Sequence, residues 1–308
     1  MSTVFDAAAT AAALPYTALA DAIEQLLHDD SVIVPPRLVQ RLPGGGSLFV
    51  MPAVDAQVAI TKLITFMPDN PASGRPSIQG DIVVFDSVQG QRIAVLDGPT
   101  VTARRTAAVS LVAARRLATS RDGPLLIVGA GVQGRAHLEA FHEGLGIGSV
   151  WIASRSAASA QALAALARAR GLQANVVADP HAVLADCPLV VTCTPAQQVV
   201  LRGTPAPRTF LCAVGAFTPA MVEWAPEVCQ HVAAHGRVVV DTRDADHEAG
   251  DLLQAGLDVT RMPTLSDVVR QGHASHASAP AMGPILFKSC GWAGWDLAAA
   301  RCVLGLAS

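Results

Sequence analysis

Three cationic side chains stand out because of where they lie in the sequence. Lys62 is inside the apolar run 58–66, Arg37 follows a pair of prolines, and Arg105 is near the start of a long helical segment. A cation within an apolar strand is costly unless it is paired or meets an anion, so we expect Lys62 to bind a ligand. A structural salt bridge is the alternative for Lys62. Arg37 and Arg105, each taken alone, fit a surface charge better.

A glycine-rich stretch, Gly129-Ala130-Gly131-Val132-Gln133-Gly134, carries the second chemical signal. It follows an apolar strand and opens a helical pattern. Glycines at these positions allow a tight turn and a close approach of the backbone to a pyrophosphate, and the helix N-terminus offers free N–H groups. This strand–turn–helix context predicts a dinucleotide site at Gly129, Gly131, Val132, Gln133 and Gly134, with a purely structural turn as the alternative.

Two further segments bear on the cofactor. The next strand ends in Ser154-Arg155-Ser156, without the acid that commonly binds the ribose 2′-hydroxyl of NAD. Hydroxyls and a guanidinium suit a 2′-phosphate, so NADPH is favoured over NADH, which would bind more weakly. The alternative for Arg155 is a solvated surface charge. Thr192 and Thr194 end another strand, where ligands of such sheets bind, although a proline-terminated strand is an equal interpretation.

The first part of the chain contains the elements expected around the three cations. An amphipathic helix is predicted at 17–29, a proline-rich loop at 67–79, and a long helix over 99–118 with Thr100 or Thr102 as its N-cap. Strands are predicted at 47–52, 58–66, 81–86 and 92–98, the last two as a hairpin. Strands that arrive in a run favour an antiparallel sheet.

After residue 121 the pattern changes to apolar strands that alternate with alanine-rich helices. The strands are predicted at 125–131, 150–154, 188–194, 209–215 and 237–242. This alternation is typical of a parallel sheet covered on both faces. The tail, 285–308, is predicted to be helical and to return to the first domain. The fold class is therefore α/β, a Rossmann-type doubly wound parallel sheet inserted in a mixed α+β domain.

Composition excludes several classes of protein. A chain of 308 residues with 51% hydrophobic and 15% charged residues favours two domains with a large core, not a disordered protein. A net charge of −3 offers no basic excess for nucleic acid, and no apolar run of about 18 residues predicts a membrane span. The first 27 residues lack the Lys or Arg of a secretory signal. Six cysteines without C-x-x-C fit reduced thiols and a cytoplasmic location.

No metal site is predicted. Cys229, His231 and His235 have a superficial ligand spacing, and His273 with His276 adds a second pair, but no set of four ligands is complete. Asp241 and the acids of 248–251 are interpreted as loop and cap residues.

Several segments, in order along nearly the whole chain, resemble the ornithine cyclodeaminase/μ-crystallin family. They are Met51-Pro52-Ala53 with Lys62, Leu96-Asp97-Gly98 through Ala108, the glycine stretch with Gln133, Ala213-Val214-Gly215, Glu248-Ala249-Gly250-Asp251, and Phe287-Lys288-Ser289-Cys290-Gly291 leading to Asp296. The resemblance implies a homodimer. It also implies a substrate and dimerisation domain at 1–118 plus 287–308, and an NADP-binding domain at 119–286.

The resemblance assigns the substrate α-carboxylate to Arg37, Lys62 and Arg105, and it adds Val214 and Lys288 to the expected cofactor residues. One departure matters. Ornithine cyclodeaminases have an aspartate shortly after the segment that corresponds to Ala213-Val214-Gly215. At that position this chain has Phe217. A phenyl ring cannot take a proton or pair with an ammonium, so ornithine cyclisation is not expected.

The resemblance is closest to the family's ketimine reductases. We therefore expect NADPH-dependent reduction of Δ1-pyrroline-2-carboxylate to L-proline and of Δ1-piperideine-2-carboxylate to L-pipecolate, in hydroxyproline or lysine catabolism. Lys62 or the Thr218 hydroxyl could help to protonate the imine, and the sequence does not separate these roles. The alternatives are another amino acid dehydrogenase of this fold, and a μ-crystallin-like protein that binds NADPH and a carboxylated ligand without turnover.

Overall fold

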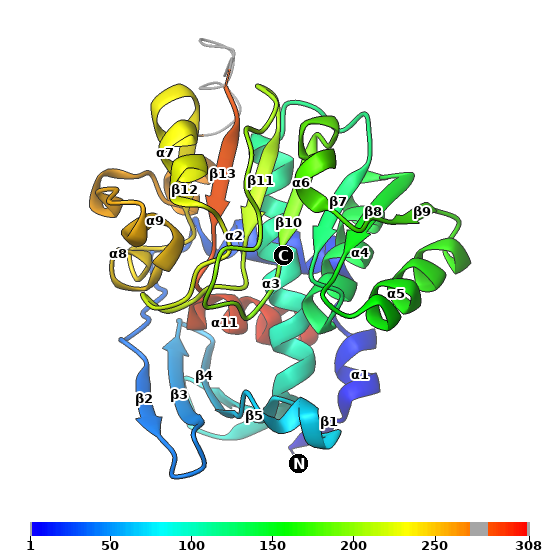
Figure 1. The fold of residues 1–308 in the computed structure, drawn as a ribbon. Helices are drawn as coiled ribbons and strands as arrows, with labels where there is room; N and C mark the ends of the chain where they lie inside the picture. Colours follow the sequence, from blue (N-terminus) through cyan, green and yellow to red (C-terminus); the bar gives the residue numbers. More distant parts are fainter. Residues whose placement is uncertain (1, 272–282, 307–308) are drawn as a thin grey trace. The chain divides into compact units, whose positions relative to one another are not determined.

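The computed structural model describes residues 2–271 and 283–306, which form two compact units (Figure 1). Unit 1 comprises the chain up to Thr106 together with the part from Trp292 on, and unit 2 is Ala107–Gly291. These limits differ from the expected domain limits. The expected boundary at 118/119 lies beyond the end of helix α3 (Gly98–Leu117), and the one at 286/287 lies inside strand β13 (Ile285–Lys288).

Unit 1 contains a six-stranded sheet in the order β1-β6-β5-β4-β3-β2. The expected strands are confirmed as β3 (Ser47–Val54), β4 (Val58–Phe66), β5 (Ile78–Asp86) and β6 (Arg92–Asp97), and all neighbours among them are antiparallel. The β5–β6 hairpin is also confirmed. The short strands β1 (Thr3–Phe5), parallel to β6, and β2 (Leu38–Arg41) were not expected.

The helices of unit 1 are α1 (Ala7–Ala12), α2 (Tyr16–Leu26) and α11 (Ala293–Val303), and α3 runs from this unit into unit 2. Helix α11 packs on α2, β3 and β4. The expected N-caps of α3 are wrong. The carboxylate of Asp97 accepts a hydrogen bond from the Thr100 N–H at 2.8 Å, so Asp97 is the cap.

Unit 2 contains a seven-stranded parallel sheet in the order β12-β13-β11-β10-β7-β8-β9. Its strands are β7 (Leu125–Val128), β8 (Ser149–Ala153), β9 (Gln173–Val176), β10 (Leu189–Thr192), β11 (Phe210–Ala213), β12 (Arg237–Val240) and β13. From β7 the chain adds β8 and β9 on one side, then returns to add β10 and β11 on the other. This reversal is the topological switch point of a Rossmann-type sheet, so the expected fold class is confirmed.

The prediction of a helical tail at 285–308 is only partly confirmed. Ile285–Lys288 is not helical but forms β13, which pairs with both β11 and β12 inside the parallel sheet (Figure 1). A run of four apolar residues is too short to distinguish a buried strand from the start of a helix by periodicity. Helix α11 begins only after the chain leaves this sheet.

Helix α4 (Val132–Leu145) packs on β7 and β10, α5 (Ala157–Ala169) packs on β8 and β9, and α7 (Pro226–His235) packs on β12 and β13. Shorter helices α6 (Pro180–Val183), α8 (Ala245–Glu248), α9 (Gly250–Gln254) and α10 (Leu265–Arg270) complete this unit. The strands of the sheet are almost wholly apolar and buried. No helix in the described ranges is both long and apolar enough to span a membrane.

Candidate functional site

The core of unit 1 holds two of the expected cations on one carboxylate. The Lys62 ammonium lies 2.7 Å from Oδ2 of Asp296, and Nε of Arg105 donates to Oδ1 of the same aspartate at 3.2 Å. All three side chains are buried. We call Lys62, Arg105 and Asp296 the Lys62 cluster. The alternative of a structural salt bridge for Lys62 is therefore partly correct, because Lys62 does have an acidic partner.

Three elements of unit 1 bring the Lys62 cluster together. The alternation of β4 buries Ile60, Lys62 and Ile64, while Leu63 between them is exposed. Helix α11 packs on β4 and carries Asp296 in its first turn, where the helix dipole favours a negative charge. Arg105 comes from the unit 1 part of α3, two turns beyond its Asp97 cap.

The charges of the Lys62 cluster do not cancel. Two cations share one carboxylate, and among the described residues neither cation has another ion-pair partner. Burial lowers the pKa of Lys62 to about 8; Asp296 opposes this shift, while the charges of Arg105 and Arg37 add to it. Arg37 is half-buried and its charge acts on Lys62. A buried cluster with excess positive charge is suited to receive an anion.

In unit 2 the glycine loop, Gly129–Gly134, has the shape that the sequence predicts. Gly129 has φ +113°, and a Cβ at Gly134 would lie 2.0 Å from the carbonyl oxygen of Gly129. Both positions therefore require glycine for internal reasons. Gly131 is different, because a Cβ there would meet nothing within 4 Å. Its lack of a side chain leaves the backbone open to a ligand.

The surroundings of the glycine loop fit a dinucleotide. No side chain caps the N-terminus of α4, so its first N–H groups are available to a pyrophosphate. Val132 in the first turn is 72% exposed, an apolar side chain that a ligand could cover. The side-chain oxygen of Gln133 is buried and accepts no hydrogen bond from the described residues. The cofactor roles of Val132 and Gln133 stay predictions.

The residues after β8 form a loop that leads into α5. Arg155 is exposed and makes no ion pair within the described ranges. Ser156 caps α5 by accepting a hydrogen bond from the Ser159 N–H at 3.2 Å, and Ser154 accepts one from the Ser156 N–H at 3.3 Å. The two serines thus order the loop on both sides of the exposed Arg155.

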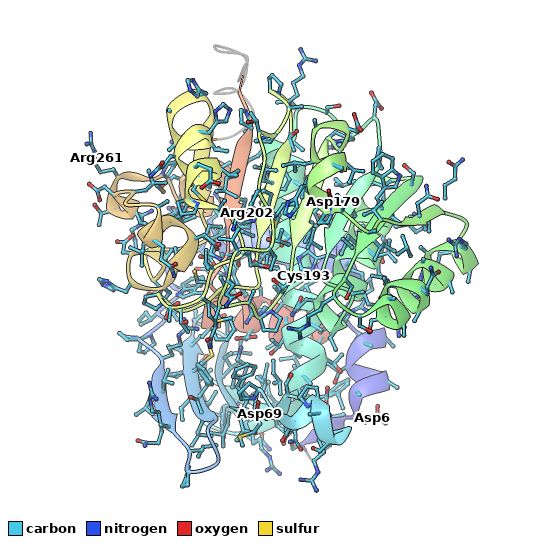
Figure 2. The ribbon with its side chains drawn as sticks, in the orientation of Figure 1. Asp6, Asp69, Asp179, Cys193, Arg202 and Arg261 are labelled. Carbon is cyan, nitrogen blue, oxygen red and sulfur yellow. The ribbon has the colours of Figure 1, made fainter. Side chains whose placement is uncertain are left out.

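The ends of β10 and β11 are tied together by buried groups. The hydroxyl of Thr192 accepts from the indole N–H of Trp224 at 2.9 Å, and Thr194 donates both its N–H and its hydroxyl to Glu223. Val214 is buried, and its N–H donates to the carbonyl of Thr192. Cys193, which Figure 2 labels, donates from Sγ to the carbonyl of Gly129 at 3.2 Å. The glycine loop and the β10 end are therefore in contact.

Lys288 is also buried, and its ammonium is paired inside the protein. Its ammonium lies 2.7 Å from Oδ2 of Asp251 and also donates to the carbonyl of Ala216. Nearby acids, Asp251 first among them, raise the pKa of Lys288 despite its burial. The structure thus gives Lys288 an internal ion pair, and a direct cofactor contact for it stays an untested expectation.

Phe217 and Thr218 follow β11 in a half-buried loop. The carbonyl of Thr218 accepts a hydrogen bond from the Met221 N–H, which makes this a tight turn. The role of the Thr218 hydroxyl stays a prediction.

Three acids have partners that were not predicted from the sequence. Asp296 appeared only as the end of a matched segment, and Glu223 was not considered. Asp251 was interpreted as a loop residue, yet it is fully buried and accepts the N–H groups of Glu223 and Trp224. An acid inside an apolar run, as in Val222-Glu223-Trp224-Ala225, was the available signal.

No group of three or more His, Cys, Asp or Glu side chains in the described ranges could hold a metal ion. Cys229 is buried in the core of unit 2, and the rings of His231 and His235 lie against each other. His273 and His276 lie outside the described residues.

Comparison with known proteins gives a consistent result. A family model described as the ornithine cyclodeaminase/mu-crystallin family matches residues 3–307. The Δ(1)-pyrroline-2-carboxylate reductase 2 of Burkholderia ambifaria is 36% identical over 96% of this chain and 93% of its own. The Δ(1)-pyrroline-2-carboxylate/Δ(1)-piperideine-2-carboxylate reductase of Azospirillum brasilense is 37% identical over 97% and 94%.

Solved structures share the fold. The Δ(1)-pyrroline-2-carboxylate reductase of Thermococcus litoralis, in complex with NADH and L-proline, has a TM-score of 0.84 at 22% identity, over 93% of this chain and 91% of its own. An archaeal alanine dehydrogenase dimer with bound NAD has a TM-score of 0.86 at 22% identity, over 99% and 95%.

Proposed function

This chain belongs to the ornithine cyclodeaminase/mu-crystallin family and is an NAD(P)H-dependent imine reductase, and we propose that it reduces cyclic ketimine carboxylates with NADPH. The proposed substrates are Δ1-pyrroline-2-carboxylate, which gives L-proline, and Δ1-piperideine-2-carboxylate, which gives L-pipecolate. The names of the Burkholderia and Azospirillum relatives support these two ring sizes.

The excess positive charge of the Lys62 cluster is the observation that carries this proposal. Among the described residues, Lys62 and Arg105 have Asp296 as their shared ion-pair partner and no other, so a substrate carboxylate would supply the missing negative charge. A charge-assisted hydrogen bond of this kind contributes about 1.5–3 kcal/mol, enough for two or three of them to fix a small imino acid. Arg37, whose charge reaches Lys62, is proposed as the third cation.

The side chain at 217 supports a reductase over a cyclodeaminase. Phe217 offers no carboxylate for the amine of an open-chain diamino acid. An apolar side chain there suits the ring methylenes of a cyclic imine, which need no polar partner.

The proposed chemistry divides between the two units. When bound at the glycine loop of unit 2, the nicotinamide supplies the hydride that is added to the imine carbon. The cations of unit 1 are proposed to hold the carboxylate and so to fix the orientation of the imino acid. The imine nitrogen needs one proton. Lys62 is the proposed source, because a pKa of about 8 lets its ammonium give up a proton near neutral pH.

NADPH is the proposed cofactor because of the loop after β8. Ser154, Arg155 and Ser156 replace the acid expected for NAD, and Arg155 is exposed and forms no ion pair with the residues that the structure describes. NADH is expected to serve more weakly.

The test is turnover by the purified full-length chain with each ketimine, followed by the absorbance of NADPH, with NADH in parallel. Fast turnover that yields L-proline or L-pipecolate supports the proposal. Turnover of pyruvate with ammonia in place of the ketimines would identify an alanine-type dehydrogenase. NADPH binding without turnover of any of them would favour a ligand-binding protein.

We also propose that the chain forms a homodimer through the sheet of unit 1. Leu38, Val50 and Leu63 are cross-strand neighbours on β2, β3 and β4, and Leu38 and Leu63 are 57% and 46% exposed. A second copy of this apolar row is a suitable partner. The archaeal alanine dehydrogenase, which shares the fold, is described as a dimer. A cytoplasmic location is proposed from the six free cysteines.

A further inference from the structure

We infer that Glu223 is a positioning residue for the nicotinamide end of the cofactor, which it serves by joining the loops after β10 and β11. The inference rests on the proposed cofactor function of unit 2. It concerns a residue that precedes α7 and that has no part in the glycine loop or in the Lys62 cluster.

The carboxylate of Glu223 is fully buried and accepts from both loops. Its Oε1 accepts from the N–H and the hydroxyl of Thr194 at 2.7 and 2.9 Å. Its Oε2 accepts from the N–H of Gly215 at 2.7 Å and from that of Ala216 at 3.3 Å. Thr194 follows β10 and Gly215 follows β11, so one side chain links the carboxyl ends of two adjacent strands.

The position of these loops in the sheet connects them with the nicotinamide. A Rossmann-type sheet has two halves, and the dinucleotide binds across the switch point between them. The glycine loop and the Arg155 loop belong to the half formed by β7, β8 and β9. The β10 and β11 loops belong to the other half, which takes the second nucleotide, here the one that carries the nicotinamide.

The loops after β10 and β11 lie in close contact at Gly215. A Cβ at Gly215 would lie 2.4 Å from the backbone N of Thr194 and 2.6 Å from Oε1 of Glu223. The N–H groups of Thr194, Gly215 and Ala216 all point at the carboxylate and need an acceptor inside the protein. Glu223 is the acceptor for all three.

The backbone of Glu223 is itself fixed. Oδ1 of Asp251 accepts from the N–H groups of Glu223 and Trp224 at 2.6 and 2.9 Å, while Oδ2 of Asp251 pairs with Lys288. Burial raises the pKa of Glu223, and the charge of Asp251 adds to this shift, while the charge of Lys288 and the N–H donors act in the opposite direction. The hydrogen bonds that reach the carboxylate from Thr194, Gly215 and Ala216 all use it as an acceptor.

This arrangement makes Glu223→Gln an informative variant. The amide is nearly the same size as the carboxylate, but one of its two ends is an NH2 group. In either orientation of the amide, its NH2 group faces the N–H of Thr194 or that of Gly215. Two donors then face each other, and a backbone N–H cannot become an acceptor. At least one loop therefore loses its anchor. Glu227→Gln is the matched control, since Glu227 lies exposed in the first turn of α7.

The experiment measures binding of two compounds to the full-length chain by calorimetry. NADPH reports on the whole cofactor site, and 2′-phospho-ADP-ribose, which lacks the nicotinamide, reports on the other half alone. Glu223→Gln should weaken NADPH about tenfold while changing 2′-phospho-ADP-ribose less than about twofold. Glu227→Gln should change neither. Glu223→Asp, which keeps the charge but withdraws it by one methylene, should give a smaller loss with the same selectivity.

Other outcomes would overturn the inference. Equal weakening of both compounds would show general damage to the unit, and unchanged NADPH binding in Glu223→Gln would show that the loops need no such anchor. Where Glu223→Gln does not fold, the same criteria apply to Glu223→Asp. A wild-type chain that binds neither compound would overturn the proposed cofactor, and the inference with it.

Discussion

At the scale of single residues, the proposed chemistry rests on an imbalance of charge in the Lys62 cluster. Lys62 and Arg105 share the carboxylate of Asp296 in the core of unit 1, so two buried positive charges face one negative charge. Desolvation works against the charged form of Lys62 and brings its pKa to about 8. The residue is then charged at neutral pH, yet close to losing its proton.

The pH dependence of turnover should follow Lys62. Its ammonium is present below a pH of about 8 and is lost above it, so kcat/KM for the ketimine should fall as pH rises through this value. In Lys62→Arg the guanidinium stays charged over this range, and the fall should disappear. The measurement is kcat/KM against pH for both proteins. An unchanged fall in the variant would assign the titration to the substrate.

Arg105→Ala should lower kcat/KM for the ketimine about 10- to 100-fold, because one charge-assisted hydrogen bond to the substrate carboxylate is lost. Steady-state kinetics with saturating NADPH test this. Arg104→Ala is the control on the same helix. Arg104 lies over the ring of Tyr16 and donates to the carbonyl of Leu14, so its loss should lower Tm but leave KM unchanged. Near-normal kinetics for Arg105→Ala would refute its carboxylate role.

At the scale of elements, a loop at a strand end is proposed to select the cofactor, and a capping residue fixes where a helix begins. The loop between β8 and α5 displays Arg155, and the serines on either side order that loop. At the start of α3, Asp97 ends β6 and caps the helix that carries Arg105. Each element is fixed by a short-range hydrogen bond, and each can be tested alone.

Arg155→Ala should weaken NADPH about 10- to 100-fold and leave NADH nearly unchanged, because only NADPH has the 2′-phosphate. The ratio of kcat/KM for the two cofactors is the readout. Arg135→Ala, on the exposed side of α4 and paired with Glu139, is the control and should leave this ratio as it is. Equal losses for both cofactors in Arg155→Ala would rule out the 2′-phosphate role.

Removing the cap of α3 should destabilise the fold moderately. Asp97→Ala leaves the Thr100 N–H without its acceptor and should lower the free energy of unfolding by about 1 kcal/mol. Asp97→Asn keeps an acceptor oxygen and should retain most of the stability. Urea unfolding of the three proteins measures this. Equal stability of Asp97→Ala and the wild type would show that another group caps the helix.

On the scale of the whole molecule, the sheet of unit 1 has one face covered by α11 and an apolar row, Leu38, Val50 and Leu63, that is not fully covered by the chain itself. The proposed homodimer would bury this row. The strands of the unit 2 sheet are buried apart from parts of the edge strands β9 and β12 and of β8.

Leu63→Glu should convert the dimer to a monomer, because a carboxylate cannot be buried there without a partner. Light scattering after gel filtration would show the mass of one chain, 31.8 kDa, instead of two. Val88→Glu is the control, since Val88 is 82% exposed in the turn between β5 and β6 and lies outside the row. A wild type that is already monomeric, or a Leu63→Glu variant that stays dimeric, would contradict the proposed interface.

The sequence alone determined the features that depend on local order. Four features can be identified from neighbours along the chain, because turns, periodicity and helix starts are local. They are the glycine loop, the run of antiparallel strands, the alternation of strands and helices after residue 121, and the presence of Arg155 where NAD-binding proteins commonly have an acid. The cation in the strand at Lys62 was recognised in the same way, from its apolar neighbours.

Only the tertiary structure decided which distant residues meet. Asp296 reaches Lys62 because α11 packs on β4, more than 200 positions away in the sequence. Glu223 joins Thr194 to Gly215 because β10 and β11 are adjacent, and β13 belongs to the sheet of unit 2 because it fits between β11 and β12. Burial and pairing of such groups depend on long-range packing, which periodicity along the chain does not encode.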